Sequence, residues 1–262
     1  RDKFDEIDLN SFNLGKIIGG FDVHTKTYVV SLQNNNNVDY DTLAFDESVK
    51  GWVSRYSYKP DQIFSLKNNY FTTFSGGAEN FNGLYKHYFG SEYGKFYGVN
   101  VDSSVTTVFN PKVSLSKNFL TIGYEGSNGW EMNDFRSDFT GVDNGINFDD
   151  VTFPVKSYDE GEFVINPATG QPVRPADYQA TFGTPYPPYN KMRAGFNRKE
   201  NKYVSNLKNN SMPRPGEIVY AQSLSGVKGM FATVVFSIDS TTNITGKKEL
   251  FAVSSTYVES SY

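Results

Sequence analysis

The chain has 262 residues, a formal net charge of -4 at pH 7 and no cysteine. The length permits one large β domain or two ordinary ones with a sizeable core. The lack of cysteine excludes thiolate catalysis, Cys-ligated metals and disulfides, and the negative charge argues against a general nucleic-acid binder, because neutralising phosphates needs concentrated Lys and Arg.

Large aromatic side chains supply much of the apolar area. The chain contains 22 Phe and 18 Tyr within a hydrophobic content of only 38%. Such rings favour β-strands and protein interfaces. No apolar run approaches the roughly 18 residues of a membrane-spanning helix, so we expect no membrane insertion. Because Arg1 rather than Met comes first, we expect a processed product or a piece, such as the C-terminal part, of a longer polypeptide.

The first part of the chain predicts a meander of short strands with alternating hydrophobicity. The predicted strands are Lys16–Asp22, Thr27–Gln33, Gly51–Tyr58, Tyr70–Ser75, Gly83–Phe89 and Lys95–Val99. We expect Tyr28, Val30 and Leu32 to share one face of the second strand. In the third strand we expect one face to hold Trp52, Tyr56 and Tyr58. The segment 60–67 (PDQIFSLK) predicts one or two helical turns, because proline is favoured at a helix start.

A second group of strands follows. Val113–Glu125 and Trp130–Phe135 predict a hairpin around Asn128 and Gly129, a pair that accepts positive φ. The segment 137–190 holds most of the prolines and predicts a long, irregular excursion that contacts a neighbouring subunit.

Three residues of this excursion are candidate Ca²⁺ ligands, since Ca²⁺ prefers hard oxygen donors. They are Asp143, Asn147 and Asp149. The segment lacks EF-hand spacing, and Asx turns in a solvated loop are the favoured explanation of the same residues.

The last part of the chain predicts a second antiparallel meander. Its strands are Lys202–Leu207, Gly216–Leu224, Gly229–Asp239 and Lys248–Glu259. We therefore predict a mainly β chain whose antiparallel meander sheets form a sandwich- or propeller-like assembly. The expected divisions are N-terminal β units in 1–136, the irregular Pro/Asp-rich excursion in 137–190 and the C-terminal meander in 191–262.

Catalytic motifs are not recognisable in the sequence. The two histidines, His24 and His87, lie in different β contexts, and adjacent carboxylates such as Asp46 and Glu47 would point to opposite faces of a strand. No phosphate loop, dinucleotide fingerprint or nucleophile elbow occurs. We predict a protein that is not an enzyme and has no cofactor, catalytic residue or established metal ligand.

Aromatic and basic residues are the better candidates, as interface residues rather than catalytic ones. The predicted interface residues are Trp52, Tyr56, Tyr58, Tyr85, Trp130, Arg198 and Lys202. Packing of the aromatic residues in the core is the alternative for the first five, and a solvated strand edge protected by charge is the alternative for the basic pair.

Seven segments together resemble a known family. They are TLAFDESVKGWVSRYSYKPD, SLKNNYFTTFSGG, GLYKHY, NPKVSLSKNFLTIGYEGSNGW, RKENKYVSNLKNN, SGVKGMFATVVFSIDS and KKELFAVSSTYVESS. The resemblance is to tail-associated virion structural proteins of crAss-like and related tailed bacteriophages, which include the muzzle. It implies a structural virion protein of the tail, made in the host bacterial cytoplasm, with no catalytic motif to inherit.

The same resemblance implies the partners of the chain. Copies would assemble around the tail axis and contact other portal, tail or virion proteins, with transient contact to phage DNA. A host-surface module that binds carbohydrate through exposed aromatic rings is the competing interpretation. A glycan-degrading enzyme is a third class, for which the sequence offers no carboxylate pair.

Overall fold

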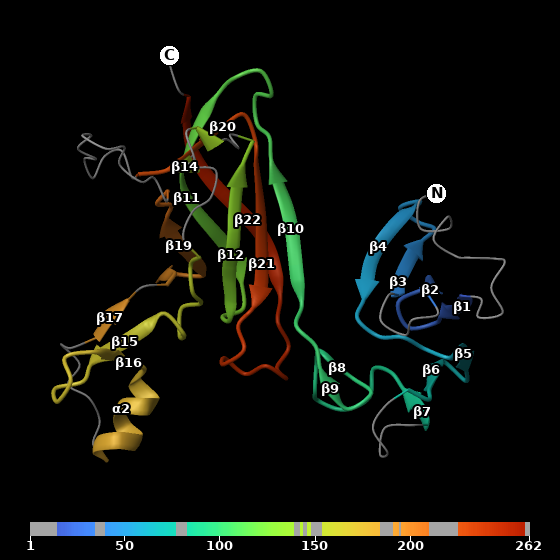
Figure 1. The fold of residues 1–262 in the computed structure, drawn as a ribbon. Coiled ribbons are helices and arrows are strands. Elements are labelled where there is room, and N and C mark those ends of the chain that lie inside the picture. The colour runs from blue at the N-terminus through green and yellow to red at the C-terminus, as the bar shows by residue number, and fades with distance from the viewer. Residues whose placement is uncertain are drawn as a thin grey trace. The chain divides into compact units, whose positions relative to one another are not determined.

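The computed structural model describes residues 15–34, 40–76, 83–138, 142–143, 146–147, 154–183, 191–193, 195–209 and 225–259. The chain forms two compact units, Arg1–Val101 and Asp102–Tyr262. The described residues are mainly β, with antiparallel sheets and one short helix (Figure 1). The two boundaries that the sequence led us to expect, 136/137 and 190/191, both fall inside the second unit.

The first unit contains two meanders and a short hairpin. Consecutive antiparallel strands β1 (Lys16–Asp22), β2 (Thr27–Gln33), β3 (Tyr40–Asp46) and β4 (Gly51–Tyr56) form the larger sheet. Strands β5 (Gln62–Leu66), β6 (Asn69–Phe74) and β7 (Gly83–Lys86) form the smaller one, and β8 (Lys95–Phe96) pairs with β9 (Val99–Asn100). Antiparallel pairing of short strands is confirmed here, but the strands form two meanders rather than one, and β3 and β5 were not among the predicted strands.

The helical turn predicted for residues 60–67 is wrong. This segment contains β5, whose Ile63 is buried while its neighbours Gln62 and Phe64 are exposed. The alternation has the period of a strand, and five residues of β5 pair with β6. Sheet pairing therefore outweighs the weak helix-start signal of Pro60.

The core of the first unit lies between its two sheets. Its buried apolar residues come from both sheets and from the segments next to them: Val29, Ala44, Tyr58, Ile63, Tyr70 and Tyr97. The face of β2 that points into this core is largely polar, because Thr27, Ser31 and Gln33 are buried together with Val29. Hydrogen bonds satisfy this face; Gln33 Nε2 donates to Ser31 Oγ, and the Thr42 hydroxyl lies 2.9 Å from the same Ser31 oxygen.

An irregularity in β4 changes the predicted faces of that strand. Ala44 pairs with Ser54 but Phe45 pairs with Trp52, so Val53 is an extra residue, as in a β-bulge. Because the bulge shifts the alternation by one residue, Trp52 shares a face with Phe45 whereas Tyr56 shares the opposite face with the buried Thr42. The prediction that Trp52 and Tyr56 lie on one face is wrong.

The second unit is built from two larger sheets. One has the order β10 (Ser104–Phe109), β21 (Ala232–Ile238), β12 (Trp130–Ser137). In the other, β11 (Lys117–Gly126) pairs along its whole length with β22 (Leu250–Glu259) and on its second edge with β19 (Lys202–Asn206) and β20 (Val227–Gly229); β18 (Asn197–Lys199) extends β19.

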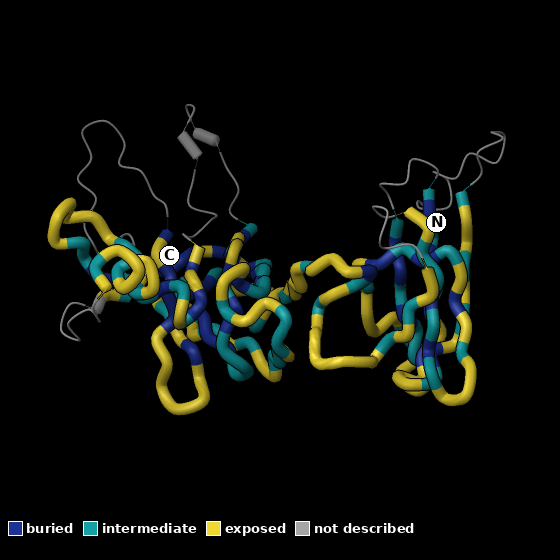
Figure 2. The backbone as a smooth tube through the Cα atoms, turned by 90° about the horizontal axis from the view of Figure 1, so that it is seen from below, coloured by how far each residue is buried: buried dark blue, intermediate teal, exposed yellow. Residues whose placement is uncertain are grey.

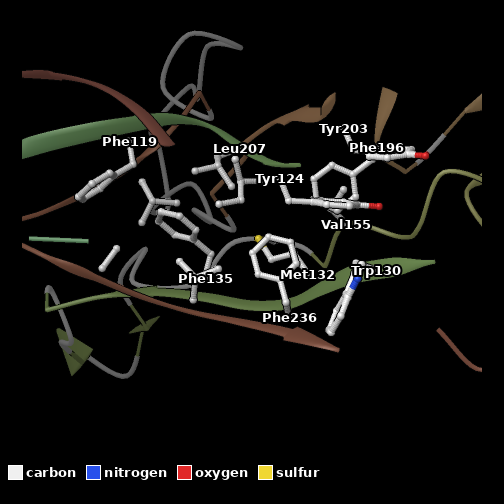
Figure 3. Close-up of a cluster of buried hydrophobic side chains, with 14 residues drawn as sticks. Phe119, Tyr124, Trp130, Met132, Phe135, Val155, Phe196, Tyr203, Leu207 and Phe236 are labelled. Atoms are coloured by element: carbon white, nitrogen blue, oxygen red, sulfur yellow. The ribbon is translucent and has the colours of Figure 1, made fainter. Parts of the chain in front are cut away.

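Buried side chains of these two sheets meet in one hydrophobic cluster. Figure 3 shows Phe119 and Tyr124 of β11 pointing toward Met132 and Phe135 of β12 and Phe236 of β21. Each of these side chains is at most 1% exposed. Burial of a large apolar side chain contributes on the order of 1.5–3 kcal/mol before the entropy of folding is subtracted, so this cluster is a major source of stability in the second unit.

Two pairings predicted for this region are wrong. Strands β11 and β12 do not form a hairpin, because they enter different sheets even though Gly129 between them has a φ of 103°. The last strands also form no meander: β19, β20 and β22 all pair with β11, whereas β21 pairs with β10 and β12. The predicted strand 216–224 lies outside the described residues. No closed propeller or barrel occurs among the described strands.

The Pro-rich segment contains more regular structure than expected. The short strands β13 (Val142–Asp143) and β14 (Ile146–Asn147) pair, and β15 (Glu162–Ile165) pairs with both β16 (Pro172–Val173) and β17 (Lys191–Arg193). Helix α2 (Pro175–Phe182) begins with a proline, which suits a first helical position, and ends at Gly183, whose φ of 67° suits glycine. Figure 2 marks which of the described residues are buried and which are exposed.

Candidate functional site: an apolar sheet face and an aromatic cleft

The outer face of the β1–β4 sheet is largely apolar although it is partly open to solvent. We use this name for the face opposite the core. Cross-strand pairs place on it the ion-paired Asp41 and Arg55 together with the apolar residues Ile17, Phe21, Tyr28, Val30, Leu32, Leu43, Phe45 and Trp52. Trp52 is 59% exposed and Phe21 is 50% exposed, and the Trp52 ring lies edge-on to Phe45 with 5.4 Å between centroids. A contiguous apolar face of this kind is a feature of protein interfaces.

An aromatic cleft of about 390 Å³ lies in the same unit. It is formed by the turn after β1, the end of β4 and the segment from β7 to β8. Its lining is His24, Tyr56, Tyr58, Tyr85, Lys86, His87, Tyr88, Phe89, Gly90, Glu92, Tyr93, Gly94, Lys95, Phe96 and Tyr97. Phe89 is the most open ring at 78% exposure, whereas Tyr58 is buried. The cleft therefore has a buried aromatic floor and an exposed aromatic rim.

Tyr88 lines one wall of this cleft and has an uncommon backbone conformation. Its φ is 56°, a region that bulky residues rarely adopt. Two contacts stabilise it: the Tyr88 hydroxyl donates to Asp22 Oδ2 at 2.5 Å, and its ring stacks on His24 with 4.1 Å between centroids. Burial, and then the hydrogen bond to Asp22, raise the pKa of the Tyr88 hydroxyl. This tyrosine is therefore a neutral donor at neutral pH.

His87 lies deeper in the cleft as a neutral ring. Its Nε2 is 2.7 Å from the Thr72 hydroxyl, which is in turn 2.9 Å from the Tyr97 hydroxyl. Burial lowers the pKa of His87 to about 4. The other neighbours of this imidazole include the aromatic rings of Tyr58 and Tyr70, which hold it in a packed environment.

The predicted interface residues are divided among several environments. Trp52 lies on the outer face, Tyr56 and Tyr85 are half-buried in the aromatic cleft, and Tyr58 forms its floor. Trp130 belongs to the core of the second unit, where it is 4% exposed and its Nε1 donates to the Glu249 carbonyl at 3.2 Å.

The basic pair lies on the exposed β18–β19 hairpin. Lys202 Nζ is 2.7 Å from Glu125 Oε1, and Arg198 Nε donates to the Glu200 carbonyl. This ion pair contributes little to stability, because water and salt screen exposed charges. Because the hairpin is exposed, Arg198 and Lys202 are both accessible to a partner.

The candidate Ca²⁺ ligands are placed only in part. The backbones of Asp143 and Asn147 belong to β13 and β14, while their side chains and the whole of Asp149 lie outside the described residues. Within the described ranges there is no group of three or more His, Asp or Glu side chains that could hold a metal ion. In the same ranges no helix has the length and apolar composition needed to cross a membrane.

Sequence reasoning missed Tyr88 and Phe89 as cleft residues, and it missed Asp22 and Thr72 as the buried partners of Tyr88 and His87. Asp22 and Thr72 are buried polar residues whose partners are 66 and 15 positions away along the chain, so no local pattern identifies them. The density of rings and glycines in HYFGSEYGKFYG, residues 87–98, is the signal that could have located the rim.

Comparison with known proteins adds a family assignment. Residues 91–210 match the family model described as the Crassvirus muzzle protein C-terminal domain. No curated protein matches the chain. The matched region includes part of the cleft and strands β10, β11 and β12, whose partners β21 and β22 lie beyond residue 210. Over residues 91–210 the chain is therefore similar to the Crassvirus muzzle protein C-terminal domain family, whose members are structural phage virion proteins.

Proposed function

We propose that the chain is a non-enzymatic subunit of the tail of a phage virion, of the muzzle type, that assembles as several copies around the tail axis. The family match over residues 91–210 carries this proposal. The protein would be synthesised in the host bacterial cytoplasm and would contact other portal, tail or virion proteins. Its net charge of -4 is compatible with transient contact to DNA that must pass without adhering.

The outer face supports this proposal physically. Monomeric proteins seldom leave large contiguous apolar patches open, whereas subunits of an assembly do. Ile17, Phe21, Tyr28 and Trp52 of this face are each about half exposed or more. We assign Trp52 and its neighbours to contacts with adjacent virion proteins, and Arg198 and Lys202 to contacts with an acidic surface of a neighbour.

The β sheets also suit a structural subunit. In the second unit, two sheets contribute to one shared core, and we propose that this is the predicted sandwich-like assembly. A sandwich of this kind leaves strand edges and the short β15–β17 sheet available for contacts with neighbours.

The test is to locate the protein on purified particles. Mass spectrometry of gradient-purified virions should detect the chain, and immunogold labelling with antibodies against the segment 166–183 should mark the tail end. This segment is suitable because it is mostly exposed. Absence of the protein from purified particles would refute the proposal, and label on the capsid surface would refute its position.

A carbohydrate-binding module is a second candidate, favoured by the aromatic cleft. Sugars stack on exposed aromatic rings, and Tyr88, Phe89 and Tyr93 are each more than half exposed at the rim. Lys86 and Glu92 lie beside these rings and could bind hydroxyl groups. A glycan array with the monomeric chain tests this function: saturable binding that Phe89→Ala abolishes would support it, and the absence of binding would exclude it for the saccharides on the array.

A further inference from the structure

Strand β22 is a long sheet edge whose protection against pairing is limited to a bulge near its start, at Phe251. Its ten residues, LFAVSSTYVE, pair with β11 from Lys117 to Gly126, and no described strand pairs with its second edge. The strand contains no Lys, Arg, Pro or Gly, and its one charged residue, Glu259, is the last. Phe251 is 73% exposed and Val258 is 50% exposed. A long edge of this composition is a template for another strand.

Most other described edges of the larger sheets carry features that oppose pairing. Strand β18 is three residues long and contains two cations, β4 is bulged and contains Arg55, and β1 contains two consecutive glycines and a charged residue at each end. Strand β12 has three charged residues, a register shift and a bridge to Val155. These are the usual means by which proteins prevent edge association.

Strand β10 is the second unprotected edge in the same unit. Its sequence, SVTTVF, is neutral and rich in β-branched residues, and among the described strands it pairs only with β21. Val108 is 61% exposed and Val105 is 37% exposed. The second unit thus has two neutral edges, one in each of its larger sheets.

We propose that the β22 edge of one copy pairs with the β10 edge of a second copy, which joins the two sheets across the subunit boundary. Pairing of β22 with itself is the competing arrangement, in which Thr106→Lys would leave association unchanged. Strand β10 presents no charge to β22. The side chains that would meet are β-branched, aromatic or hydroxyl-bearing, and such cross-strand pairs stabilise a sheet.

The pairing uses two different surfaces of each copy. Contacts of this heterologous kind can close into a ring, which is the arrangement that copies around a tail axis require. The inference therefore deepens the proposed function and rests on it. Main-chain hydrogen bonds between the two strand edges are the contacts by which the copies recognise each other.

Complementation between two variants tests this pairing. Ser254→Lys places a charge on the exposed side of β22, and Thr106→Lys does the same on β10. Ser54→Lys in β4, the edge of the other unit, is the matched control. Sedimentation velocity of the full chain over a concentration series measures association, and circular dichroism checks that each variant is folded.

We expect the unsubstituted chain and Ser54→Lys to associate with the same midpoint concentration. Ser254→Lys and Thr106→Lys should each raise the midpoint at least tenfold. An equimolar mixture of these two variants should restore dimers, because one copy retains an intact β10 edge and the other an intact β22 edge. A monomeric unsubstituted chain, a Thr106→Lys variant that associates normally, or a mixture that stays monomeric would each overturn the inference.

These outcomes are separate from the test of the proposed function. If virions contain the protein at the tail but the variants associate normally, the edge pairing is wrong and the structural role remains. If purified virions lack the protein, the structural role is wrong whatever the sedimentation results are.

Discussion

The hydroxyl of Tyr88 donates a hydrogen bond of 2.5 Å to the carboxylate of Asp22, which is 0% exposed. The same carboxylate accepts from the backbone N–H of His24 at 2.8 Å and from the hydroxyl of Thr25 at 2.9 Å. A buried carboxylate needs several donors, since its desolvation is costly. The bond therefore links the turn after β1 to the rim of the aromatic cleft, 66 residues later.

Tyr88→Phe should destabilise the chain by about 1–3 kcal/mol, because it removes one donor from a buried carboxylate. It should also loosen the rim, since the φ of 56° at this position would lose a restraint. Chemical denaturation measures the first effect, and amide hydrogen exchange in residues 87–94 measures the second. Tyr93→Phe, in the same segment and with the same 51% exposure as Tyr88, is the matched control, because the hydrogen bond to Asp22 comes from Tyr88 and not from Tyr93; equal losses from both variants would contradict the prediction.

His87 should make the chain less stable in mild acid. Burial lowers its pKa to about 4 in the folded chain from an ordinary value of 6.5. Between these values the unfolded chain binds the proton and the folded chain does not. The free energy of unfolding should therefore fall as the pH drops from about 6.5 to about 4, by an amount on the order of 3 kcal/mol. Above pH 6.5 this contribution is constant.

The measurement is urea denaturation at several pH values, compared between the unsubstituted chain and His87→Gln. The difference in pH dependence between the two isolates His87 from the carboxyl groups that titrate at lower pH. The exposed His24 provides a control, since His24→Gln should retain the dependence. An NMR titration that places the His87 midpoint near 6.5 would show that the ring is not desolvated.

Strand positions could be predicted from the sequence better than strand partners. Strands β1, β2 and β6 begin and end close to their expected residues, because alternating residues and turn residues are local signals. Partners depend on the whole unit. Gly129 adopts the positive φ that the Asn128-Gly129 pair indicates, yet β11 and β12 enter different sheets, in which β11 pairs with β22 and β12 pairs with β21.

The strand β2 shows why the buried face of a sheet could be predicted only in part. The sequence correctly places Tyr28, Val30 and Leu32 on one face of β2 but does not indicate which face is buried. The opposite face is the buried one, where Ser31 and Gln33 find hydrogen-bond partners in Thr42 and in the Pro60 carbonyl. Similarly, the exposure of Trp52 depends on a bulge at Val53 that no local pattern indicates. The aromatic composition predicted an interface but not its location.

The two tryptophans should differ sharply in their contribution to stability. Trp130→Ala removes a side chain that is 4% exposed and leaves a cavity, which costs about 3–5 kcal/mol. Trp52→Ala removes one that is 59% exposed and should change stability by no more than about 0.5 kcal/mol. Calorimetry of both variants measures this difference. A large loss for Trp52→Ala in the monomeric chain would show that the outer face is already covered by the chain itself.

Gly195 is expected to be intolerant of even one added carbon. A Cβ at this position would lie 2.6 Å from the Ser157 carbonyl oxygen and close to that of Lys156. Both obstacles are backbone atoms, which cannot rotate away as a side chain can. The neighbouring Phe196 is 0% exposed and its N–H donates to the Lys156 carbonyl at 2.9 Å. A shift of residues 156–157 would therefore disturb the core of the second unit.

We expect Gly195→Ala to reduce the free energy of unfolding by about 1–3 kcal/mol, the range for overpacking a well-packed site. Gly51→Ala is the matched control, because the nearest atom to its added Cβ is 3.8 Å away; it should be neutral or slightly stabilising. Urea denaturation compares the two. If both variants unfold at the same urea concentration, Gly195 does not approach residues 156–157 closely in solution. The backbone that places Phe196 in the core would then follow a different course.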